Sequence, residues 1–292
     1  MAPEVDNIAI LIEEKKMTEK QKTQKAKTAW EIVSISRHPK RPVLQDYLSA
    51  ITKNFIEFHG DRYFSDDPAM IGGFAEIGNQ KVMLIGHNKG KNTNQNIERN
   101  FGMALPDGYR KALRLMKLAQ RFNIPVVTII DTPGAFPGLE AEERGQAEAI
   151  AKNLTEMASI EVPIVCVVIG EGGSGGALGI GVGDKVLMLS NAIYSVISPE
   201  GCASILWRDA KFAPDAAEAL NLTAKALHKH GVIDEIIEEP GEGAHSDYKA
   251  IANSVKKSIL KNLEDLKKLS VDELIQSRFE KYSGIGKFSV NK

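Results

Sequence analysis

The hydrophobic positions of the chain change their period along its length, and these changes predict alternating strands and helices. Two apolar runs at residues 70–77 and 81–87 flank the turn-forming sequence Gly78-Asn79-Gln80, which is typical of a β-hairpin. A helix is expected over about 107–122, where apolar residues recur at helical spacing. Its predicted buried face consists of Ala112, Leu115, Met116, Ala119 and Phe122. Apolar, β-branched runs at 124–131 and 162–170 predict two buried strands.

The second half of the chain continues this alternation. Helices are expected at about 141–159 and from Ser198-Pro199 through Trp207, where the serine is a suitable N-cap and the proline suits the first helical position. A long amphipathic helix with a break near Ser270 is expected at about 246–280. Further strands are predicted at 185–190, 192–198 and 232–237.

A unit of strand, loop and helix recurs at a nearly constant interval. Its strands begin at residues 81, 124 and 162, which are 43 and 38 residues apart. A repeat of this length is typical of stacked supersecondary units rather than of one doubly wound sheet. The sequence therefore predicts an α/β fold built from a repeated motif.

The first 42 residues differ from the rest. Residues 13–28 are charged and contain no aromatic residue, so they predict an isolated or frayed helix rather than part of a core. The dipeptides His38-Pro39 and Arg41-Pro42 mark a boundary, because a residue that precedes proline avoids the α region. We expect a short N-terminal extension, helical or flexible, over 1–42 and one domain over 43–292.

Composition and charge exclude several classes of protein. Among 292 residues, 43% are hydrophobic and 26% charged, which is typical of a globular chain and not of a disordered one. The net charge of −1 gives no electrostatic reason to expect binding to nucleic acid or to an anionic membrane. Two cysteines 36 positions apart, Cys166 and Cys202, do not supply a structural zinc site. We therefore expect no metal site. No apolar run reaches about 18 residues, so we expect a soluble protein, with the cytoplasm as its location.

The candidate chemistry lies in two glycine-rich loops, each of which follows a predicted buried strand. Residues 131–138 read DTPGAFPG and residues 170–179 read GEGGSGGALG. Function in α/β proteins gathers at such strand ends. Adjacent glycines at the start of a helix present backbone N–H groups without partners, and such groups bind a developing oxyanion. A purely structural interpretation, in which the glycines permit tight packing of helix on strand, stays open.

Three other interpretations of the sequence are weaker. The series Gly170, Gly172 and Gly175 matches a dinucleotide-binding fingerprint, but the acidic residue expected about 20 positions later is absent. The sequence around Ser174 matches the nucleophile motif G-x-S-x-G of a serine hydrolase. Its partners would come from one aspartate and one histidine among Asp209, Asp215, His228, His230 and His245. Cations share one face of the predicted helix at 107–122, as either a solvated surface or a phosphate-binding stripe: Arg110, Arg114 and Lys117.

Several sequence blocks closely resemble the α subunit of bacterial acetyl-CoA carboxylase carboxyltransferase. The resemblance covers about residues 43–285, and its blocks stand at 59–62, 67–73, 99–103, 108–117, 131–138, 141–146, 170–179 and 194–207. It implies a crotonase-like (ClpP/crotonase) fold, which is a spiral of repeated ββα units. Members of this family often carry a longer helical extension before the catalytic domain. The extension is shorter and rich in lysine here.

The resemblance also implies an activity and its partners. The family transfers the carboxyl group from carboxybiotin, held on the biotin carboxyl carrier protein, to acetyl-CoA, and thereby forms malonyl-CoA in the first step of fatty acid biosynthesis. A β subunit would complete an α2β2 carboxyltransferase, and biotin carboxylase would belong to the full complex. No metal in this chain, no nucleic acid and no membrane are expected. A serine hydrolase and a non-catalytic scaffold subunit are the alternatives.

Site residues are carried over from the family by motif. Gly175 and Gly176 match a backbone oxyanion-hole pair that we expect at the ureido oxygen of biotin, with Gly172 and Gly173 on the biotin side. Gly134 and Ala135 match the loop that supplies the companion donor. The biotin anion can itself remove a proton from acetyl-CoA, so the chemistry requires no catalytic histidine or glutamate.

Other residues receive weaker roles. Ser174 is expected to be a small loop residue or a helix cap rather than a nucleophile. Tyr194 and Glu200 are expected either to line the site or to serve packing and helix capping. The helix at Ser198-Pro199 is a candidate contact surface for the partner. A second candidate, which equally suits packing on the sheet, is the stripe of Ile251, Val255, Ile259 and Leu263.

Overall fold

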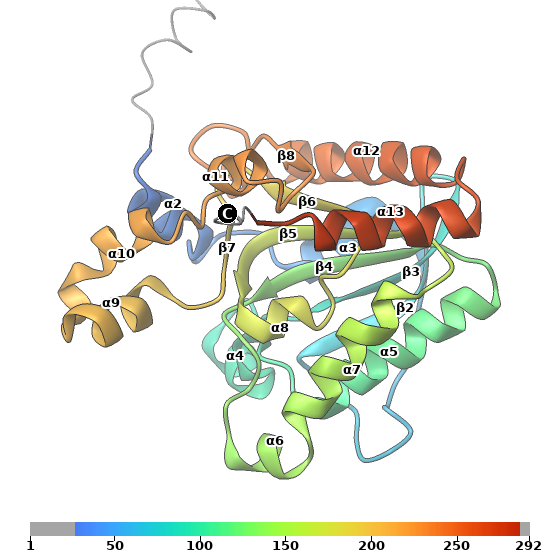
Figure 1. Ribbon diagram of the computed structural model, residues 1–292, viewed down its shortest axis with the longest axis horizontal. Helices are drawn as coiled ribbons and strands as arrows, with labels where there is room; N and C mark the ends of the chain where they lie inside the picture. The colour runs from blue at the N-terminus through green and yellow to red at the C-terminus, as the bar shows by residue number, and fades with distance from the viewer. Residues whose placement is uncertain (1–26, 287–292) are drawn as a thin grey trace, which may run out of the picture.

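The computed structural model describes residues 27–286, which form one mixed β-sheet covered by helices on both faces (Figure 1). Within this range the sheet has eight strands in the order β1-β2-β3-β4-β5-β6-β8, and β7 pairs with the end of β5. The strands are β1 Thr52–Glu57, β2 Met70–Ile77, β3 Gln80–His87, β4 Val126–Thr132, β5 Ile164–Gly173, β6 Lys185–Leu189, β7 Ile193–Ser195 and β8 Glu235–Ile237.

The predicted hairpin is confirmed as β2 and β3, which pair antiparallel from Met70 opposite His87 to Ile77 opposite Gln80. Gly78 takes φ +61° in the turn, a conformation that glycine adopts without strain. From β3 onward, β4, β5, β6 and β8 run parallel. Every residue of β4 is buried, as its continuous apolar sequence predicts for a central strand covered on both faces.

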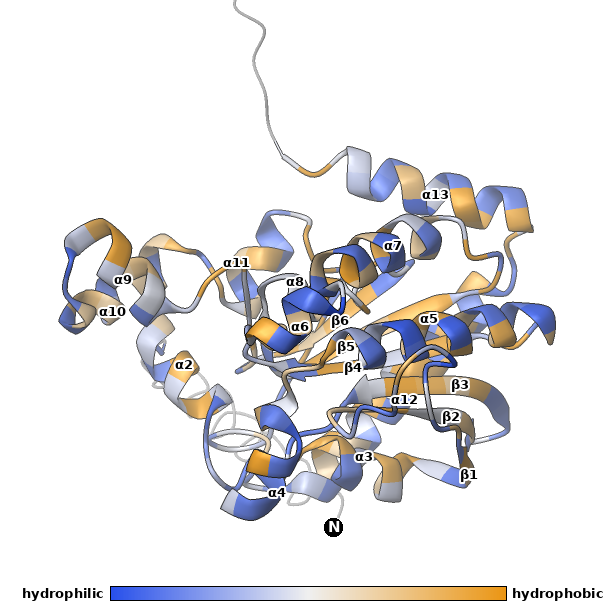
Figure 2. Cartoon of the chain, turned by 90° about the horizontal axis from the view of Figure 1, so that it is seen from below, coloured by the Kyte–Doolittle hydropathy of each residue, from blue (hydrophilic) through white to orange (hydrophobic). Residues whose placement is uncertain are grey.

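Helices cover the two faces of the sheet (Figures 1 and 2). On one face lie α5 (Pro106–Arg121) and α7 (Gln146–Ala158), and on the other lie α3 (Leu44–Ile51) and α12 (Tyr248–Leu266). The buried face predicted for α5 is confirmed for Ala112, Leu115, Met116 and Ala119. Phe122 was the exception, because the helix ends at Arg121 and the Phe122 side chain is 62% exposed.

The helix predicted at 141–159 is interrupted. It consists of α6 (Leu139–Glu143) and α7, because Gly145 takes φ +84° between them and no helix continues through that conformation. The strand predicted at 192–198 is shorter than expected, since only Ile193–Ser195 pairs with β5. The helix predicted after Ser198 is confirmed as α9 (Pro199–Trp207), and Ser198 Oγ accepts a hydrogen bond from Gly201 N.

The C-terminal helices form as predicted, with the break at Ser270. α12 is followed by α13 (Val271–Ser283), and Ser270 caps α13 through a reciprocal pair of bonds with Glu273. The apolar stripe of α12 is at most 1% exposed at each of four positions: Ile251, Val255, Ile259 and Leu263. The stripe therefore packs on the sheet, and its alternative role as a contact surface for a partner was wrong.

Three helices form a lobe at one edge of the sheet, which we call the α9 arm: α2 (Ala29–Ser36), α9 and α10 (Ala213–Ala219) (Figure 1). Its small core contains Ala29, Val33, Ile193, Ala217 and Leu222. The charged segment predicted at 13–28 lies almost wholly outside the described residues, and the division at residue 42 stays a prediction. Short helices complete the fold: α4 Thr93–Glu98, α8 Ser174–Leu178, α11 Ala224–Lys229 and two 3-10 turns, Asn100–Gly102 and Ala210–Phe212. None of the helices described over 27–286 is long and apolar enough to cross a membrane.

Candidate active site at two glycine loops

The two glycine loops follow the neighbouring parallel strands β4 and β5, and their backbones touch. A Cβ atom added at Gly176 would lie 2.3 Å from the carbonyl carbon of Gly134 and 2.5 Å from the nitrogen of Ala135. A Cβ atom at Gly173 would lie 2.0 Å from the carbonyl oxygen of Pro133. Only glycine permits this approach, so Gly173 and Gly176 fix the spacing between the loops. The structure thus brings together the two loops that the sequence singles out.

Several backbone N–H groups at this contact have no partner. The N–H groups in the first turn of α8, including those of Gly175 and Gly176, have none inside the helix, and the N-cap residue Gly173 has no side chain to supply one. Within residues 27–286, Ala135 N donates no hydrogen bond, whereas Gly134 N donates to Thr132 Oγ1 at 3.2 Å. Of the predicted donors in the first loop, Ala135 is therefore the free one.

Two of the glycines face open space. Around Gly134 no heavy atom lies within 4 Å of an added Cβ, and around Gly175 the first neighbour is Ile150 Cδ1 at 3.7 Å. A side chain at either position would enter this space rather than the fold. Gly172 and Gly173, which the resemblance places on the biotin side, pair with β7, and the ring of Tyr194 lies against Gly172. Tyr194, in β7, thus packs against the second loop at Gly172.

Ser174 has a strained backbone but no triad partner. Its φ of +49° lies in the left-handed region that serine seldom adopts. The structure makes Gly173 the N-cap of α8, so the expectation that Ser174 caps the helix was wrong. In the part of the chain that the structure describes, Ser174 Oγ bonds to no histidine. His228 and His230 are exposed, and His245 stacks on His38 with ring centres 3.8 Å apart.

An ion cluster that the sequence analysis missed lies beneath the loops. Lys89 Nζ is 2.8 Å from Asp131 Oδ1 and 3.1 Å from Glu171 Oε2, and all three side chains are largely buried. Burial opposes the charge on Lys89, but the two carboxylates outweigh it and raise the pKa of Lys89. Burial likewise opposes ionisation of Glu171, and Lys89 and Arg37 together hold its pKa below the usual range. A signal was available in the sequence, since Asp131 and Glu171 are acidic residues at the start of the two glycine loops.

The cluster continues to the α9 arm. Arg37, which ends α2, donates from Nε to Glu171 Oε1 at 2.7 Å and from Nη1 to Glu200 Oε1 at 2.5 Å. Glu200 lies in the first turn of α9, where it pairs with Arg37. A cavity of about 570 Å³ opens over the cluster and reaches the first loop at Pro133. The cavity wall also includes Phe101.

Two buried aromatic residues support the second loop from below. Tyr109 donates from its hydroxyl to the carbonyl of Gly176 at 3.2 Å, and its side chain is fully buried. His87 is also fully buried, and neither ring nitrogen has a partner at full hydrogen-bond geometry within residues 27–286, but the backbone of Gly176 lies close enough to favour the charged ring in part. Burial and the nearby charge of Lys89 lower the pKa of His87 to about 3. The ring is therefore neutral at physiological pH.

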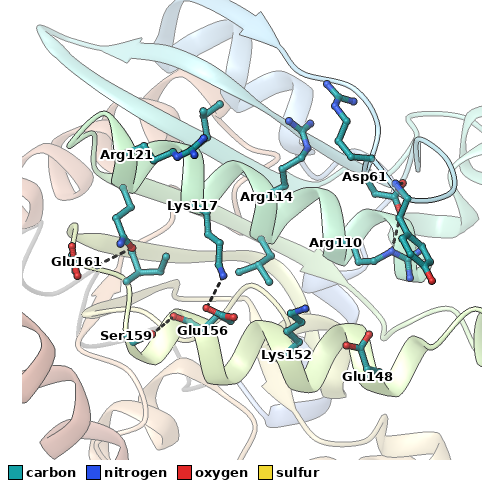
Figure 3. Close-up of a pocket in the computed structure, with 16 residues that line it drawn as sticks. Asp61, Arg110, Arg114, Lys117, Arg121, Glu148, Lys152, Glu156, Ser159 and Glu161 are labelled. Atoms are coloured by element: carbon teal, nitrogen blue, oxygen red, sulfur yellow. Dashed lines mark hydrogen bonds and ion pairs between the residues drawn. The ribbon is translucent and has the colours of Figure 1, made fainter.

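The stripe of cations on α5 lies along a separate groove of about 1020 Å³ between α5 and α7 (Figure 3). No residue of either glycine loop lines this groove. Each cation already has an internal partner: Arg110 bonds to Asp61 at 2.7 Å, Lys117 to Glu156 at 2.8 Å, and Arg114 to the carbonyl of Gly60 at 3.1 Å. Because the three cations are paired within the fold, these contacts favour an ordinary helix surface over a phosphate-binding stripe.

Comparison with known proteins places the chain among carboxyltransferases. The family model described as "Acetyl co-enzyme A carboxylase carboxyltransferase-like" matches residues 3–286. The chain is 54% identical over 282 residues to "Acetyl-coenzyme A carboxylase carboxyl transferase subunit alpha" of Chlorobium limicola, with 94% of this chain and 85% of that protein covered. It is 58% identical over 259 residues to the protein of that name from Methylococcus capsulatus, with 89% and 81% covered.

Solved structures support the fold. The transcarboxylase 12S structure with methylmalonyl-coenzyme A bound superposes with a TM-score of 0.63 at 18% identity, and covers 90% of this chain and 46% of that one. A Pseudomonas malonate decarboxylase hetero-tetramer in complex with coenzyme A gives a TM-score of 0.61 at 14% identity, with 75% and 88% covered. These neighbours confirm the crotonase-like fold that the resemblance implies.

Proposed function

Because the chain belongs to the acetyl-CoA carboxylase carboxyltransferase family, as a subunit that transfers carboxyl groups, we propose that its two glycine loops form the transfer site. Carboxyltransferases of this kind act on a biotin-linked carboxyl group and a coenzyme A thioester. In the finer proposal, the carboxyl group leaves carboxybiotin on its carrier protein and joins acetyl-CoA to form malonyl-CoA. The observation that carries the proposal is the direct contact between the loops, which gathers unpaired backbone donors at one place.

The residues present suit the chemistry that carboxybiotin supplies, which is a carboxyl group whose departure leaves negative charge on the ureido oxygen. We assign the N–H groups of Gly175 and Gly176 to that oxygen, since they have no partner in α8. Ala135 N supplies the companion donor from the first loop, while Gly134 keeps the approach open. Gly172 and Gly173 hold the second loop beside β7 on the biotin side. No side-chain nucleophile is needed.

The chain is one subunit of a multisubunit enzyme. We propose that a β subunit completes the site in an α2β2 assembly, and that the biotin carboxyl carrier protein and biotin carboxylase belong to the full complex. One set of loops here provides donors along one side of the reacting atoms. A face-to-face partner would supply the opposite side and contacts to the acyl-CoA. We also propose a cytoplasmic location, on the composition of the sequence.

The test uses the chain assembled with its β-type partner, assayed for carboxyl transfer from malonyl-CoA to biotin. Gly175→Val places a side chain in the open space without striking the fold, where the first neighbour of Cβ is Ile150. We expect a loss of about 10²–10³ in kcat, as large as for loss of one oxyanion donor, because the valine side chain keeps the developing oxyanion away from the N–H groups. The melting temperature should stay close to that of the wild type. A near-normal rate would remove this loop from the mechanism.

The matched control is Ser174→Ala, which separates the serine hydrolase alternative from the proposal. A backbone site keeps its rate within a few-fold when the hydroxyl is removed, because Ser174 Oγ bonds to no histidine in the described chain. If Ser174 were a nucleophile, the Ser174→Ala variant would lose almost all activity. Loss of transfer in Ser174→Ala together with a normal rate in Gly175→Val would show that the serine hydroxyl, and not the backbone of the loop, acts in the reaction.

A further inference from the structure

We propose that Lys89 is a positioning residue for carboxyl transfer, which holds Asp131 and Glu171 together and thereby sets the relative position of the two glycine loops. The inference rests on the proposed function, because it assigns Lys89 a role only if these loops form the site. Lys89 lies outside both loops, in the segment between β3 and α4. Lys89 contributes one positive charge, which lies between the carboxylates of Asp131 in β4 and Glu171 in β5.

The contacts of Asp131 show how tightly the strands are joined at this point. Asp131 Oδ1 accepts from Lys89 Nζ at 2.8 Å and from the backbone nitrogen of Glu171 at 3.0 Å. A Cβ atom at Gly170 would lie 2.4 Å from the same oxygen, so the carboxylate rests directly on the backbone of β5. Asp131, the second-last residue of β4, is therefore bonded to β5, the strand that leads into the second loop. Any shift of Asp131 changes the spacing of the loops.

Lys89 is needed because the cluster holds two carboxylates. Asp131 and Glu171 side chains are 6% and 12% exposed, and each has an oxygen within 3.1 Å of Lys89 Nζ. Without the ammonium group, two largely buried negative charges would repel each other at the roots of the loops. The loops meet through backbone atoms at Gly176 and Ala135, so repulsion below changes the alignment of their N–H groups. Misplacement by about 1 Å is enough to reduce a rate about 10²-fold.

Arg37 extends the cluster but is less central to it. It shares Glu171 with Lys89 and also binds Glu200 of the α9 arm, and its side chain is 33% exposed. Solvent screens such a pair more than the buried one. Arg37 therefore neutralises part of the charge on Glu171 but makes no contact with Asp131. Among the residues that the structure describes, only Lys89 forms ion pairs with both carboxylates.

The experiment measures kcat and KM for both substrates in the assembled enzyme. Lys89→Met keeps the length of the side chain and removes its charge. We expect kcat to fall about 10²-fold, with each KM within about threefold, since the loops are misaligned but not blocked. In the double variant Lys89→Met with Asp131→Asn, the buried charge is balanced again, and we expect about a tenfold recovery of kcat. Lys117→Met, which breaks an ion pair away from the loops, is the matched control.

Each outcome decides the proposal. An unchanged kcat in Lys89→Met overturns it. A loss of kcat that the double variant does not recover also overturns it, because Lys89 would then act on the substrate directly. Should Lys89→Met fail to fold, the double variant carries the test, and it must fold and turn over faster than the background. Gly175→Val distinguishes the two proposals: if that variant is impaired and Lys89→Met is not, the proposed site stands and only the role of Lys89 fails.

Discussion

Gly175 and Gly176 are neighbours in the second loop, yet their surroundings are opposite. A Cβ atom at Gly176 would strike the backbone of the first loop at 2.3 Å, whereas one at Gly175 meets only Ile150 at 3.7 Å. Gly176→Ala should therefore lower both the rate and the stability, the latter by about 1–3 kcal/mol for overpacking. Gly175→Ala should leave the unfolding midpoint nearly unchanged. Chemical denaturation and the transfer assay together measure the difference, and equal stability of the two variants would contradict the contact between the loops.

His87 should make the stability of the protein depend on pH. Burial and Lys89 lower its pKa to about 3 in the folded state, against about 6.5 in an unfolded chain. Between these values the unfolded chain binds a proton that the folded chain does not, so stability falls as the pH drops through this window. From pH 7 to pH 5 the loss from this one group is about 2 kcal/mol. The loss should vanish in His87→Leu.

The measurement is the difference in denaturant midpoint between His87→Leu and the wild type at pH 7 and pH 5. Burial raises the pKa of Asp67 to about 6, which has the opposite effect on the pH dependence, but Asp67 is present in both proteins and cancels in the difference. At pH 7 the variant should be about as stable as the wild type, because leucine removes two buried ring nitrogens that lack well-formed hydrogen bonds and loses only a weak contact with the backbone of Gly176. A parallel fall in both proteins would show that His87 is protonated in the fold.

At the scale of elements, a buried arginine joins α13 to α7 and to the segments that lead into β5 and β6. Arg278 is 1% exposed and binds Asp184 at 2.8 Å, and it also donates to the carbonyls of Met157, Ile160 and Val162. Arg278→Met leaves Asp184 buried without its partner, so we expect the free energy of unfolding to fall by about 3–5 kcal/mol. Adding Asp184→Asn should restore part of this loss. Exposed Lys268→Met is the control, and a similar effect in both single variants would contradict the assignment.

The sequence predicted elements where a local signal was complete. The hairpin turn at Gly78, the helix cap at Ser198 and the helix break at Ser270 each depend on a few residues that are adjacent in the sequence. All three are confirmed. Phe122 and Gly145 were misjudged because apolar periodicity does not register where a helix stops or kinks. A left-handed glycine overrides a continuous pattern of apolar positions.

The candidate site was predictable in its loops and not in its charges. The high glycine content identified the segments 131–138 and 170–179, because positions where two backbones approach closely require glycine. Lys89 lies 42 and 82 positions from the carboxylates that it joins, and no spacing in the sequence connects them. The packing of Gly176 on Ala135 likewise depends on β4 and β5 being neighbours in the sheet. Long-range contacts of this kind appear only once the fold is known.

At the scale of the whole molecule, the α9 arm projects from the rest of the fold (Figure 2). It exposes large apolar side chains. Ile205 and Leu206 are 71% and 65% exposed near the end of α9, and Val196 before the helix is 74% exposed. An exposed apolar group on a projecting element is typical of a surface that another protein covers. The C-terminal stripe is buried, so the arm is the remaining candidate from the sequence for contact with the β subunit.

Ile205→Glu tests this assignment because it places a charge in the proposed interface without disturbing the core. We expect the variant chain to fold with an unchanged melting temperature, and its dissociation constant for the β-type partner to rise at least about tenfold, as for loss of an interface anchor. Carboxyl transfer should fall in parallel at low partner concentration and recover at high concentration. Phe279→Glu, which changes a 66% exposed residue on α13, is the control and should bind normally. Unchanged association of Ile205→Glu would place the interface elsewhere, and full transfer by the chain without any partner would show that the two loops alone complete the site.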